Sequence, residues 1–268
     1  MSQGLSLGHV RNGPSGENVY PRSVQLEGKT AIVTGASSGI GAAVVRALRA
    51  EGARVAGGAR RLDRVDADVA LELDVTDPAS AERFVAAAVE QLGGVDVLVN
   101  NAGLALGRDP FDDSTEADED VVLQTNVHGL IRMTRLVLPQ LRDGGHIVNM
   151  GSVAGKAAYP NGSLYVTSKF AVHGFTQALR EDLLGRPIRI TNVAPGLVET
   201  DFSRVRFRGD EEKACAVYAG VALGGPVRPE DVADCVVFAL TRPPNVNVDE
   251  LVVTALAQSS GARILRED

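Results

Sequence analysis

From Thr30 onward, short runs rich in Val, Ile and Leu alternate with longer amphipathic stretches. A short apolar run bounded by turn residues is typical of a buried strand, and a longer stretch with helical periodicity is typical of a helix. The strand candidates are Thr30–Thr34, Arg54–Ala56, Val69–Leu73, Val95–Val99, His146–Met150, Ile188–Val193 and Leu251–Thr254. The helix candidates include Ile40–Ala50, Pro78–Leu92, Asp118–Leu141, Ser163–Leu184 and Pro229–Leu240. This alternation predicts an α/β fold, a doubly wound parallel sheet with helices on both faces.

The alternating region is expected to form one domain. The 268 residues are 44% hydrophobic and 23% charged, a composition typical of a globular protein with a sizeable core. No linker or change in composition divides the region, so we expect residues 28–268 to form a single Rossmann-type domain. Residues 1–27 are rich in Gly, Ser, Asn and Pro without periodicity, and are expected to be a flexible tail.

Charge and cysteine content narrow the class of partner. The formal net charge is −7, whereas proteins that bind nucleic acid or membrane surfaces are usually basic. We therefore expect a small-molecule partner, with no nucleic acid and no membrane. The two cysteines, Cys215 and Cys235, have no His cluster nearby, so neither a disulfide framework nor a metal site is expected. The N-terminal stretch lacks the apolar run of a signal peptide, which favours a cytoplasmic protein.

A glycine-rich turn, TGASSGIG, spans residues 34–41 and joins the first strand candidate to the first helix candidate. Glycines in such a turn let the backbone approach a pyrophosphate, and the helix amides and dipole attract its negative charge. The spacing differs from the commoner GxGxxG fingerprint, and a tight connection without a ligand is the alternative. The residues expected to contact a dinucleotide here are Gly35, Ser37, Ser38, Gly39, Ile40 and Gly41.

Two arginines, Arg60 and Arg61, follow the second strand candidate. At this place a carboxylate would bind the 2′-hydroxyl of NAD, whereas an arginine can bind the 2′-phosphate of NADP. Because no acidic residue lies at the strand end, the sequence favours NADP(H) as cofactor. Arg60 is the main candidate, with Arg61 and Ser37 as helpers, and a solvated basic pair at a helix start is the alternative.

Polar and small residues follow the third and fourth strand candidates. Asp74 and Val75 are expected to contact the adenine, because a carboxylate can accept a hydrogen bond from its amino group. The same segment also reads as a helix N-terminus, since Asp77 precedes Pro78. The residues expected to line the cofactor ribose after the fourth strand are Asn101, Ala102 and Gly103, and a simple Asn-rich turn is the alternative.

A serine, a tyrosine and a lysine follow the fifth strand candidate. Ser152 comes just after the strand, and Tyr165 and Lys169 lie four residues apart in the next helix candidate. Residues at i and i+4 share a helix face, which would place the lysine ammonium beside the tyrosine hydroxyl. A nearby cation favours phenolate, so the pKa of Tyr165 is expected to fall from about 10 towards the range of a general acid–base. Ser152 could then hydrogen-bond a substrate oxygen.

In this order and spacing, the motifs resemble the short-chain dehydrogenase/reductase family over about residues 28–255. The resemblance implies that Tyr165 is the catalytic acid–base, that Ser152 orients and polarises a carbonyl, and that Lys169 holds the nicotinamide ribose and tunes Tyr165. It also implies that Asn126 anchors a water in a proton relay, and that NADP(H) is the cofactor. The residues implied to face the nicotinamide are Pro195, Gly196, Val198 and Thr200, with Val198 and Thr200 holding the carboxamide.

The resemblance extends to the region that forms a variable substrate lid in this family, here about residues 201–226. Its sequence is similar to the branch of NADP-dependent 3-hydroxy acid (serine-type) dehydrogenases. The lid carries Arg204, Arg206 and Arg208, which suit a carboxylate substrate, although pairing with nearby glutamates or solvent is the alternative. The function implied is hydride transfer between a nicotinamide and a carbonyl/alcohol substrate, either a 3-hydroxy acid or a semialdehyde. Reduction of bulkier ketones and a non-catalytic NADP-binding role are the alternatives.

Two further expectations concern the surroundings of the site. The stretch Leu62–Ala70 is short for the helix that usually joins the second and third strands in the family. The family is also commonly tetrameric, so a homo-oligomer, and a tetramer in particular, is expected. The apolar residues that could bury against a second subunit are Leu123, Leu130, Phe175 and Leu179, and packing against the sheet alone is the alternative.

Overall fold

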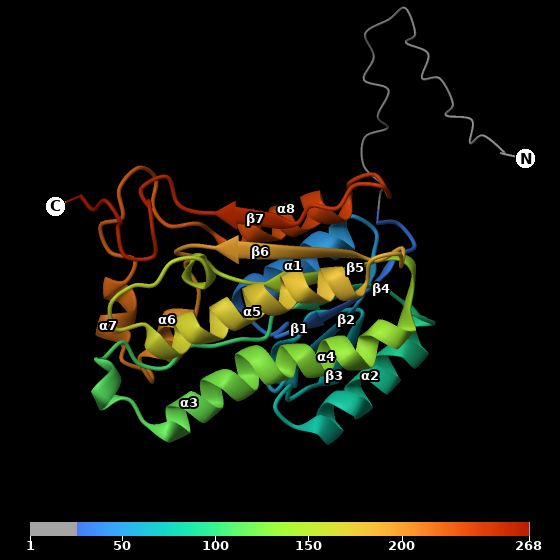
Figure 1. Ribbon diagram of the computed structural model, residues 1–268, viewed down its shortest axis with the longest axis horizontal. Coiled ribbons are helices and arrows are strands. Elements are labelled where there is room, and N and C mark those ends of the chain that lie inside the picture. The colour runs from blue at the N-terminus through green and yellow to red at the C-terminus, as the bar shows by residue number, and fades with distance from the viewer. Residues whose placement is uncertain (1–25, 268) are drawn as a thin grey trace, which may run out of the picture.

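The computed structural model describes residues 26–267, so nearly all of the expected N-terminal tail lies outside the described residues. These residues form a seven-stranded parallel sheet (Figure 1). The strands are β1 (Thr30–Thr34), β2 (Arg54–Ala59), β3 (Val69–Glu72), β4 (Val95–Asn100), β5 (Leu141–Met150), β6 (Arg189–Pro195) and β7 (Glu250–Val253). Their order across the sheet is β3-β2-β1-β4-β5-β6-β7, which confirms the predicted doubly wound fold.

Helices cover both faces of the sheet (Figure 1). One face carries α1 (Gly39–Ala50) and α8 (Pro229–Leu240), and the other carries α2 (Pro78–Leu92), α4 (Leu130–Val137) and α5 (Ser163–Asp182). A cluster of buried apolar side chains lies on each face of the sheet, and successive residues of a strand point alternately into one and the other. In β1, for example, Val33 packs on the face covered by α1 and α8, and Ile32 packs on the opposite face. Because both faces are covered, the strands need near-continuous apolar runs, as the sequence shows.

The predicted helix Asp118–Leu141 is wrong as a single helix. The chain instead forms α3 (Glu116–Leu123), a π-helical turn (Gln124–Gly129), α4 and a 3-10 turn (Leu138–Gln140), after which residue 141 begins β5. Asn126 lies in the π-helical turn and hydrogen-bonds the backbone of Leu104. Pro139 ends α4 because proline has no amide proton for the helical ladder. A single π-helical turn of this kind is often found at functional sites.

Short helices occupy two of the connections that the sequence singled out. The segment between β2 and β3 contains one 3-10 turn, Leu62–Arg64, in agreement with its short length. The expected lid region contains α6 (Phe202–Arg206) and α7 (Glu211–Ala216), which lie at the left-hand end of the molecule in Figure 1. The remaining turns are the 3-10 segments Phe111–Asp113 and Val153–Gly155.

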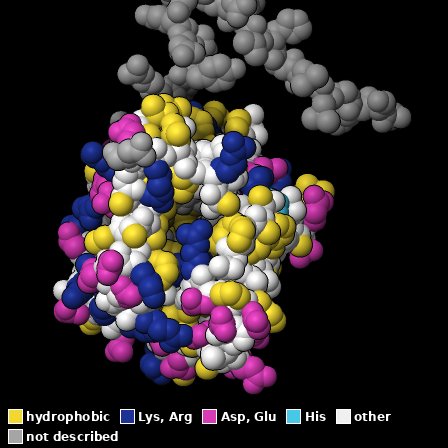
Figure 2. Space-filling view, turned by 90° about the vertical axis from the view of Figure 1, so that its left-hand side faces the viewer, with side chains coloured by type: hydrophobic (Ala, Val, Ile, Leu, Met, Phe, Trp, Pro, Cys, Tyr) yellow, Lys and Arg dark blue, Asp and Glu magenta, His cyan; other side chains and the backbone are white. Residues whose placement is uncertain are grey.

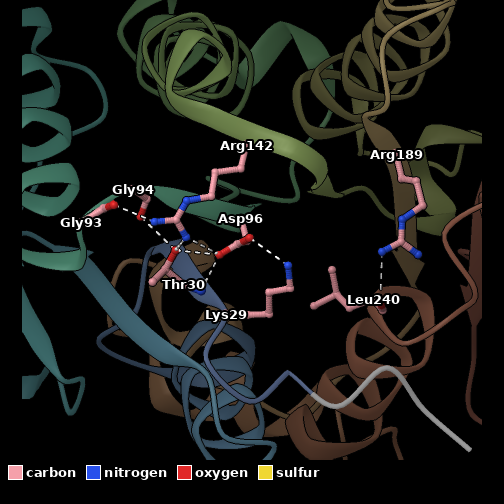
Figure 3. A network of polar contacts seen from close by, with 8 residues as sticks. All are labelled: Lys29, Thr30, Gly93, Gly94, Asp96, Arg142, Arg189 and Leu240. Atoms are coloured by element: carbon pink, nitrogen blue, oxygen red, sulfur yellow. Dashed lines mark hydrogen bonds and ion pairs between the residues drawn. The ribbon is translucent and has the colours of Figure 1, made fainter.

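A polar network joins the amino-terminal ends of β1, β4 and the start of β5 (Figure 3). The Asp96 carboxylate accepts hydrogen bonds from Lys29 Nζ at 3.0 Å, from the Thr30 amide at 3.0 Å and from Arg142 Nη1 at 2.9 Å. Burial alone would raise the pKa of Asp96, but the hydrogen bonds from Thr30 and Lys29 hold it below its usual value. These contacts fix the strand starts, at the end of the sheet opposite the carboxyl ends of the strands.

Candidate active site

A cavity of about 610 Å³ lies at the carboxyl ends of the strands. Residues that follow β1, β2, β3, β4, β5 and β6 all contribute to its wall. In an open parallel sheet this edge is where ligands bind, because the loops after adjacent strands converge there. Apart from Gly41 and Asn126, every residue that the sequence analysis placed at the cofactor or at the catalytic centre lines this cavity.

The glycine-rich turn forms the wall after β1, and its backbone requires glycine at specific places. Gly35 has φ +68°, and a Cβ there would lie 2.9 Å from the Ala102 Cα. A Cβ on Gly41 would lie 2.2 Å from the Gly35 oxygen, so this glycine supports the turn from within α1 and does not face the cavity. The Asn101 side chain holds the turn in place, because its Nδ2 donates to the Thr34 backbone oxygen at 2.9 Å. Together these contacts leave the N-terminus of α1 open to the cavity.

Arg60 and Arg61 stand at the cavity wall after β2 and are exposed. Arg61 Nη2 donates to Ser38 Oγ at 3.0 Å and to Ser37 Oγ at 3.4 Å, which ties the end of β2 to the glycine-rich turn. Arg60 has no carboxylate within ion-pair distance among residues 26–267. The two guanidinium groups therefore present positive charge at this end of the cavity.

The segment after β3 fills both roles that the sequence left open for it. Asp74 lines the cavity, while Asp77 caps α2 by accepting hydrogen bonds from the amides of Ala79 and Ser80. Burial alone would raise the pKa of Asp74, but hydrogen bonds from Thr76, with smaller charge contributions from arginines, hold it below its usual value. A carboxylate is thus present in the cavity wall at neutral pH.

Ser152, Tyr165 and Lys169 meet at the other end of the cavity. Ser152 follows β5 and is 8% exposed, and its Oγ accepts from the Ala154 amide at 3.1 Å. Tyr165 lies in the first turn of α5, and Lys169 lies one turn further on. The Lys169 ammonium lies 5.7 Å from the centre of the Tyr165 ring and donates to the Met150 oxygen at 2.8 Å. The lysine therefore lies beside the tyrosine, as the i and i+4 spacing predicts.

The expected fall in the pKa of Tyr165 is wrong. Burial raises the pKa of Tyr165 to about 12, opposed by a hydrogen bond from Ser152 and by the charge of Arg206. Burial also lowers the pKa of Lys169 to about 8. Desolvation disfavours the charged form of each group, and at Tyr165 it outweighs the opposing effects of the Ser152 hydrogen bond and the Arg206 charge.

Asn126 lies behind the cavity wall. Its amide nitrogen donates to the Leu104 oxygen at 2.7 Å and to Ser168 Oγ at 3.0 Å, and its oxygen accepts from the Leu104 amide at 2.8 Å. The side chain is 1% exposed and joins the π-helical turn to the loop after β4 and to α5. Its role in a proton relay stays a prediction.

The segment after β6 lines the cavity with Pro195, Gly196, Val198 and Thr200, as the resemblance implies. Gln258, which sequence reasoning missed, holds this segment by accepting a hydrogen bond from the Leu197 amide at 2.7 Å. A Cβ on Gly196 would lie 2.1 Å from the Gln258 oxygen, which explains the glycine. Gln258 carries no recognisable motif, because its place depends on how the chain returns to the cavity after β7.

The three arginines of the expected lid region differ in their contacts. Arg204 pairs with Asp201 at 3.0 Å and with Glu211 at 2.6 Å. Arg208 pairs with Asp118 at 2.7 Å. Arg206 alone of the three lines the 610 Å³ cavity, together with Arg108 and Tyr159, which sequence reasoning also missed.

No group of three or more His, Cys, Asp or Glu side chains within residues 26–267 is placed to hold a metal ion. Over the same residues, no helix combines the length and apolar character needed to cross a membrane.

Comparison with known proteins gives consistent matches over most of the chain. The profile of the short chain dehydrogenase family matches residues 29–211. A curated protein of Schizosaccharomyces pombe, named NADP-dependent 3-hydroxy acid dehydrogenase, is 40% identical over 262 residues, covering 91% of this chain and 98% of its own. A homologue with the same activity in its name, YdfG of Escherichia coli strain K12, is 38% identical over 248 residues, covering 88% of this chain and 99% of its own.

Among solved structures, the closed form of a serine dehydrogenase complexed with NADP+ matches with a TM-score of 0.82 and 36% identity. The match covers 89% of this chain and 100% of that one.

Proposed function

The chain belongs to the short-chain dehydrogenase family, and we propose that it interconverts a 3-hydroxy acid and the corresponding carbonyl acid with NADP(H) as cofactor. It is an NADP-dependent oxidoreductase that acts on CH–OH groups. One observation carries the proposal: Ser152, Tyr165 and Lys169 stand at one end of a cavity whose other end is lined by the glycine-rich turn and Arg60. The relatives named for 3-hydroxy acids and serine support the choice of substrate class.

The cavity fits a dinucleotide phosphate. The N-terminus of α1 opens into it at Gly35 and Gly39, which have positive φ angles and no side chain to cover the backbone. Such a helix end attracts a pyrophosphate. Arg60, helped by Arg61, would bind the 2′-phosphate. When bound, NADP(H) supplies or accepts the hydride.

The remaining cofactor contacts follow the lining of the cavity. Lys169 would hold the nicotinamide ribose, and Val198 and Thr200 the carboxamide. The other lining residues proposed to contact the cofactor are Ser37, Ser38, Ile40, Asp74, Val75, Asn101, Ala102, Gly103, Pro195 and Gly196.

Tyr165 is proposed to move the proton. In the reductive direction a phenol with a pKa of about 12 is protonated at neutral pH, so it can donate to the carbonyl oxygen of the substrate. Ser152 Oγ hydrogen-bonds the same oxygen and orients it. In the oxidative direction Tyr165 acts as a phenolate, which the neighbouring Lys169 ammonium stabilises, and it becomes a phenol when it accepts the proton of the substrate hydroxyl. Asn126 is proposed to anchor the water that continues this relay.

The lid and the assembly extend the proposal. Residues 201–226, with α6 and α7, are proposed to close over the substrate. The protein is proposed to be cytoplasmic and to form a tetramer of identical chains.

Of the apolar residues first considered for an interface, Leu130 and Leu179 are buried in the monomer. Other apolar side chains are exposed and could form two interfaces. One surface contains Val121 of α3 and Phe170 of α5. The other contains Phe238 of α8, Val252 of β7 and Leu256, which follows β7.

Light scattering after size-exclusion chromatography tests the assembly. We expect the mass of four chains, because the apolar side chains lie on two separate surfaces that can each pair with a copy. A monomer at micromolar concentration would contradict the proposal.

The activity is tested by a panel of substrates with both NADP+ and NADPH. The panel contains L-serine, 3-hydroxypropanoate, semialdehydes, ketosteroids and quinones. We expect turnover of the 3-hydroxy acids and of the semialdehydes. Reduction of ketosteroids without any activity on the acids would overturn the choice of substrate.

A further inference from the structure

Among residues 26–267, one of the three arginines of the proposed lid has no carboxylate partner. Arg204 and Arg208 are neutralised by Asp201, Glu211 and Asp118. Arg206 makes no ion pair with any residue in the part of the chain that the structure describes. Instead its Nε donates to the Gly107 oxygen at 2.9 Å, and its Nη2 donates to the Tyr159 hydroxyl at 3.1 Å. A guanidinium has five N–H donors, so three of them remain for a ligand.

Arg206 is held firmly at the wall of the cavity. Its backbone oxygen accepts from the Gly107 amide at 2.9 Å, while its side chain donates to the Gly107 oxygen. The guanidinium lies 5.7 Å from the centre of the Tyr159 ring and 5.8 Å from the centre of the Tyr165 ring. These contacts join α6 to the loop after β4 and fix the cation beside the proposed acid–base.

The charge around this part of the cavity is positive. Arg108, Arg206 and Arg266 line it here, whereas the acidic lining residues are Asp74, which lies after β3, and Asp201, which already pairs with Arg204. Figure 2 shows this end of the molecule, with Lys and Arg side chains around the hollow at its centre. In a protein of net charge −7, a local excess of cations in a cavity marks a place for an anion.

The position of Arg206 matches the shape of a 3-hydroxy acid. In such a molecule two carbon–carbon bonds, each of about 1.5 Å, separate the carboxyl carbon from the carbon that reacts. When the hydroxyl oxygen is at Tyr165, the carboxylate must therefore lie within a short distance of the same ring, where Arg206 stands. A planar guanidinium binds a carboxylate with two parallel hydrogen bonds.

We propose that Arg206 binds the substrate carboxylate, with Arg108 as a second cation, and that it makes the enzyme select acids over neutral alcohols. This inference rests on the proposed function and names the residue behind its substrate class. Arg108 lies 5.7 Å from the centre of the same Tyr159 ring, so Tyr159 serves as a positioning residue between the two arginines.

The test compares 3-hydroxypropanoate with its methyl ester, which has no charge. In Arg206→Gln, we expect the ratio of kcat/KM for the acid to kcat/KM for the ester to fall by about 30-fold or more, mainly through KM for the acid. Arg206→Lys keeps the charge without the planar fork, so its ratio should stay within about tenfold of the wild-type ratio. Arg204→Gln is the matched control on the same helix, and its ratio should not change.

A binding measurement keeps the test independent of turnover. Calorimetry on the NADP+-loaded Tyr165→Phe protein gives the Kd of 3-hydroxypropanoate with and without Arg206→Gln. We expect a Kd about 30-fold higher when the arginine is replaced. An equal loss for acid and ester, an unchanged Kd, or the same effect in Arg204→Gln would overturn the role of Arg206. If the wild-type protein oxidises neither compound, the proposed function fails, and the Kd comparison still decides where the carboxylate binds.

Discussion

Tyr165 and Lys169 are two neighbouring groups whose pKa values move in opposite directions. Burial raises the pKa of Tyr165 to about 12 and lowers the pKa of Lys169 to about 8. Each shift favours the neutral form, which is what a low-dielectric pocket does to any isolated ionisable group. The pair is thus suited to donate a proton to a carbonyl, whereas oxidation requires a phenolate that Lys169 must stabilise.

Replacing Tyr165 by Phe removes the proposed proton carrier while keeping the ring. We expect kcat to fall by about 10²- to 10⁴-fold, because proton transfer by a positioned group contributes about that much. Binding of NADPH, followed by its fluorescence, should change only a few-fold. Turnover comparable to that of the wild type would refute the assignment.

Replacing Arg60 by Asp tests the cofactor preference. A carboxylate at the end of β2 would repel the 2′-phosphate and accept a hydrogen bond from a 2′-hydroxyl, so preference should shift from NADPH towards NADH. The measurement is the ratio of kcat/KM for the two cofactors. Arg64→Asp is the control, because Arg64 is exposed in the same connection and does not line the cavity. An unchanged ratio in Arg60→Asp would rule out this role.

At the scale of elements, the strands and most helices could be predicted because their apolar periodicity reflects burial on fixed faces. The break at Asn126 could not, since the sequence 118–141 is amphipathic throughout and the π-helical turn depends on a partner 22 residues away, Leu104. At the site, too, only part could be predicted from the sequence. Ser152 and Tyr165 could be predicted because they follow a strand and belong to a recognisable motif, whereas Gln258 and Arg108 reach the cavity only through tertiary packing.

β5 and β6 carry a buried pair, His146 and Thr191, from which we expect the stability of the sheet to depend on pH. His146 Nε2 lies 2.7 Å from Thr191 Oγ1, and its Nδ1 is buried without a hydrogen-bond partner in the described residues. Burial, with a smaller contribution from the charge of Arg189, lowers the pKa of His146 from 6.5 to about 3. Figure 3 shows that Arg189 is itself held near the end of α8, where it donates to the Leu240 oxygen at 3.0 Å.

The sign of the pH effect follows from the lowered pKa. Below 6.5 the unfolded chain binds a proton at His146 that the folded protein does not bind, so stability falls as the pH drops from 6.5 towards 3. At about pH 5 this term amounts to about 2 kcal/mol of unfolding free energy.

We expect His146→Gln, which can still hydrogen-bond Thr191, to lose less stability than the wild type between pH 6.5 and about pH 5. Urea unfolding at both pH values gives the difference. Equal losses in the two proteins would show that His146 does not carry the effect.

At the scale of the whole molecule, the order of the strands decides where the chemistry occurs. Chain connections run outward from β1 towards β3 and, on the other side, from β4 towards β7, so a crevice opens at the carboxyl ends between β1 and β4. The repeated alternation in the sequence was enough to predict this fold and its ligand edge. The contacts of the arginines within residues 201–226 and the path of the segment after β7 could not be predicted, because loops carry no periodicity and are placed by tertiary packing.

The central claim is that hydride passes between C3 of a hydroxy acid and NADP+ in this cavity. The most direct measurement uses 3-hydroxypropanoate deuterated at C3, with NADP+ and the purified protein, and mass spectrometry of the reduced cofactor. The account predicts NADPH that carries one deuterium per molecule, and loss of this product in Tyr165→Phe. Unlabelled NADPH, or labelled NADPH formed equally well by Tyr165→Phe, would contradict it.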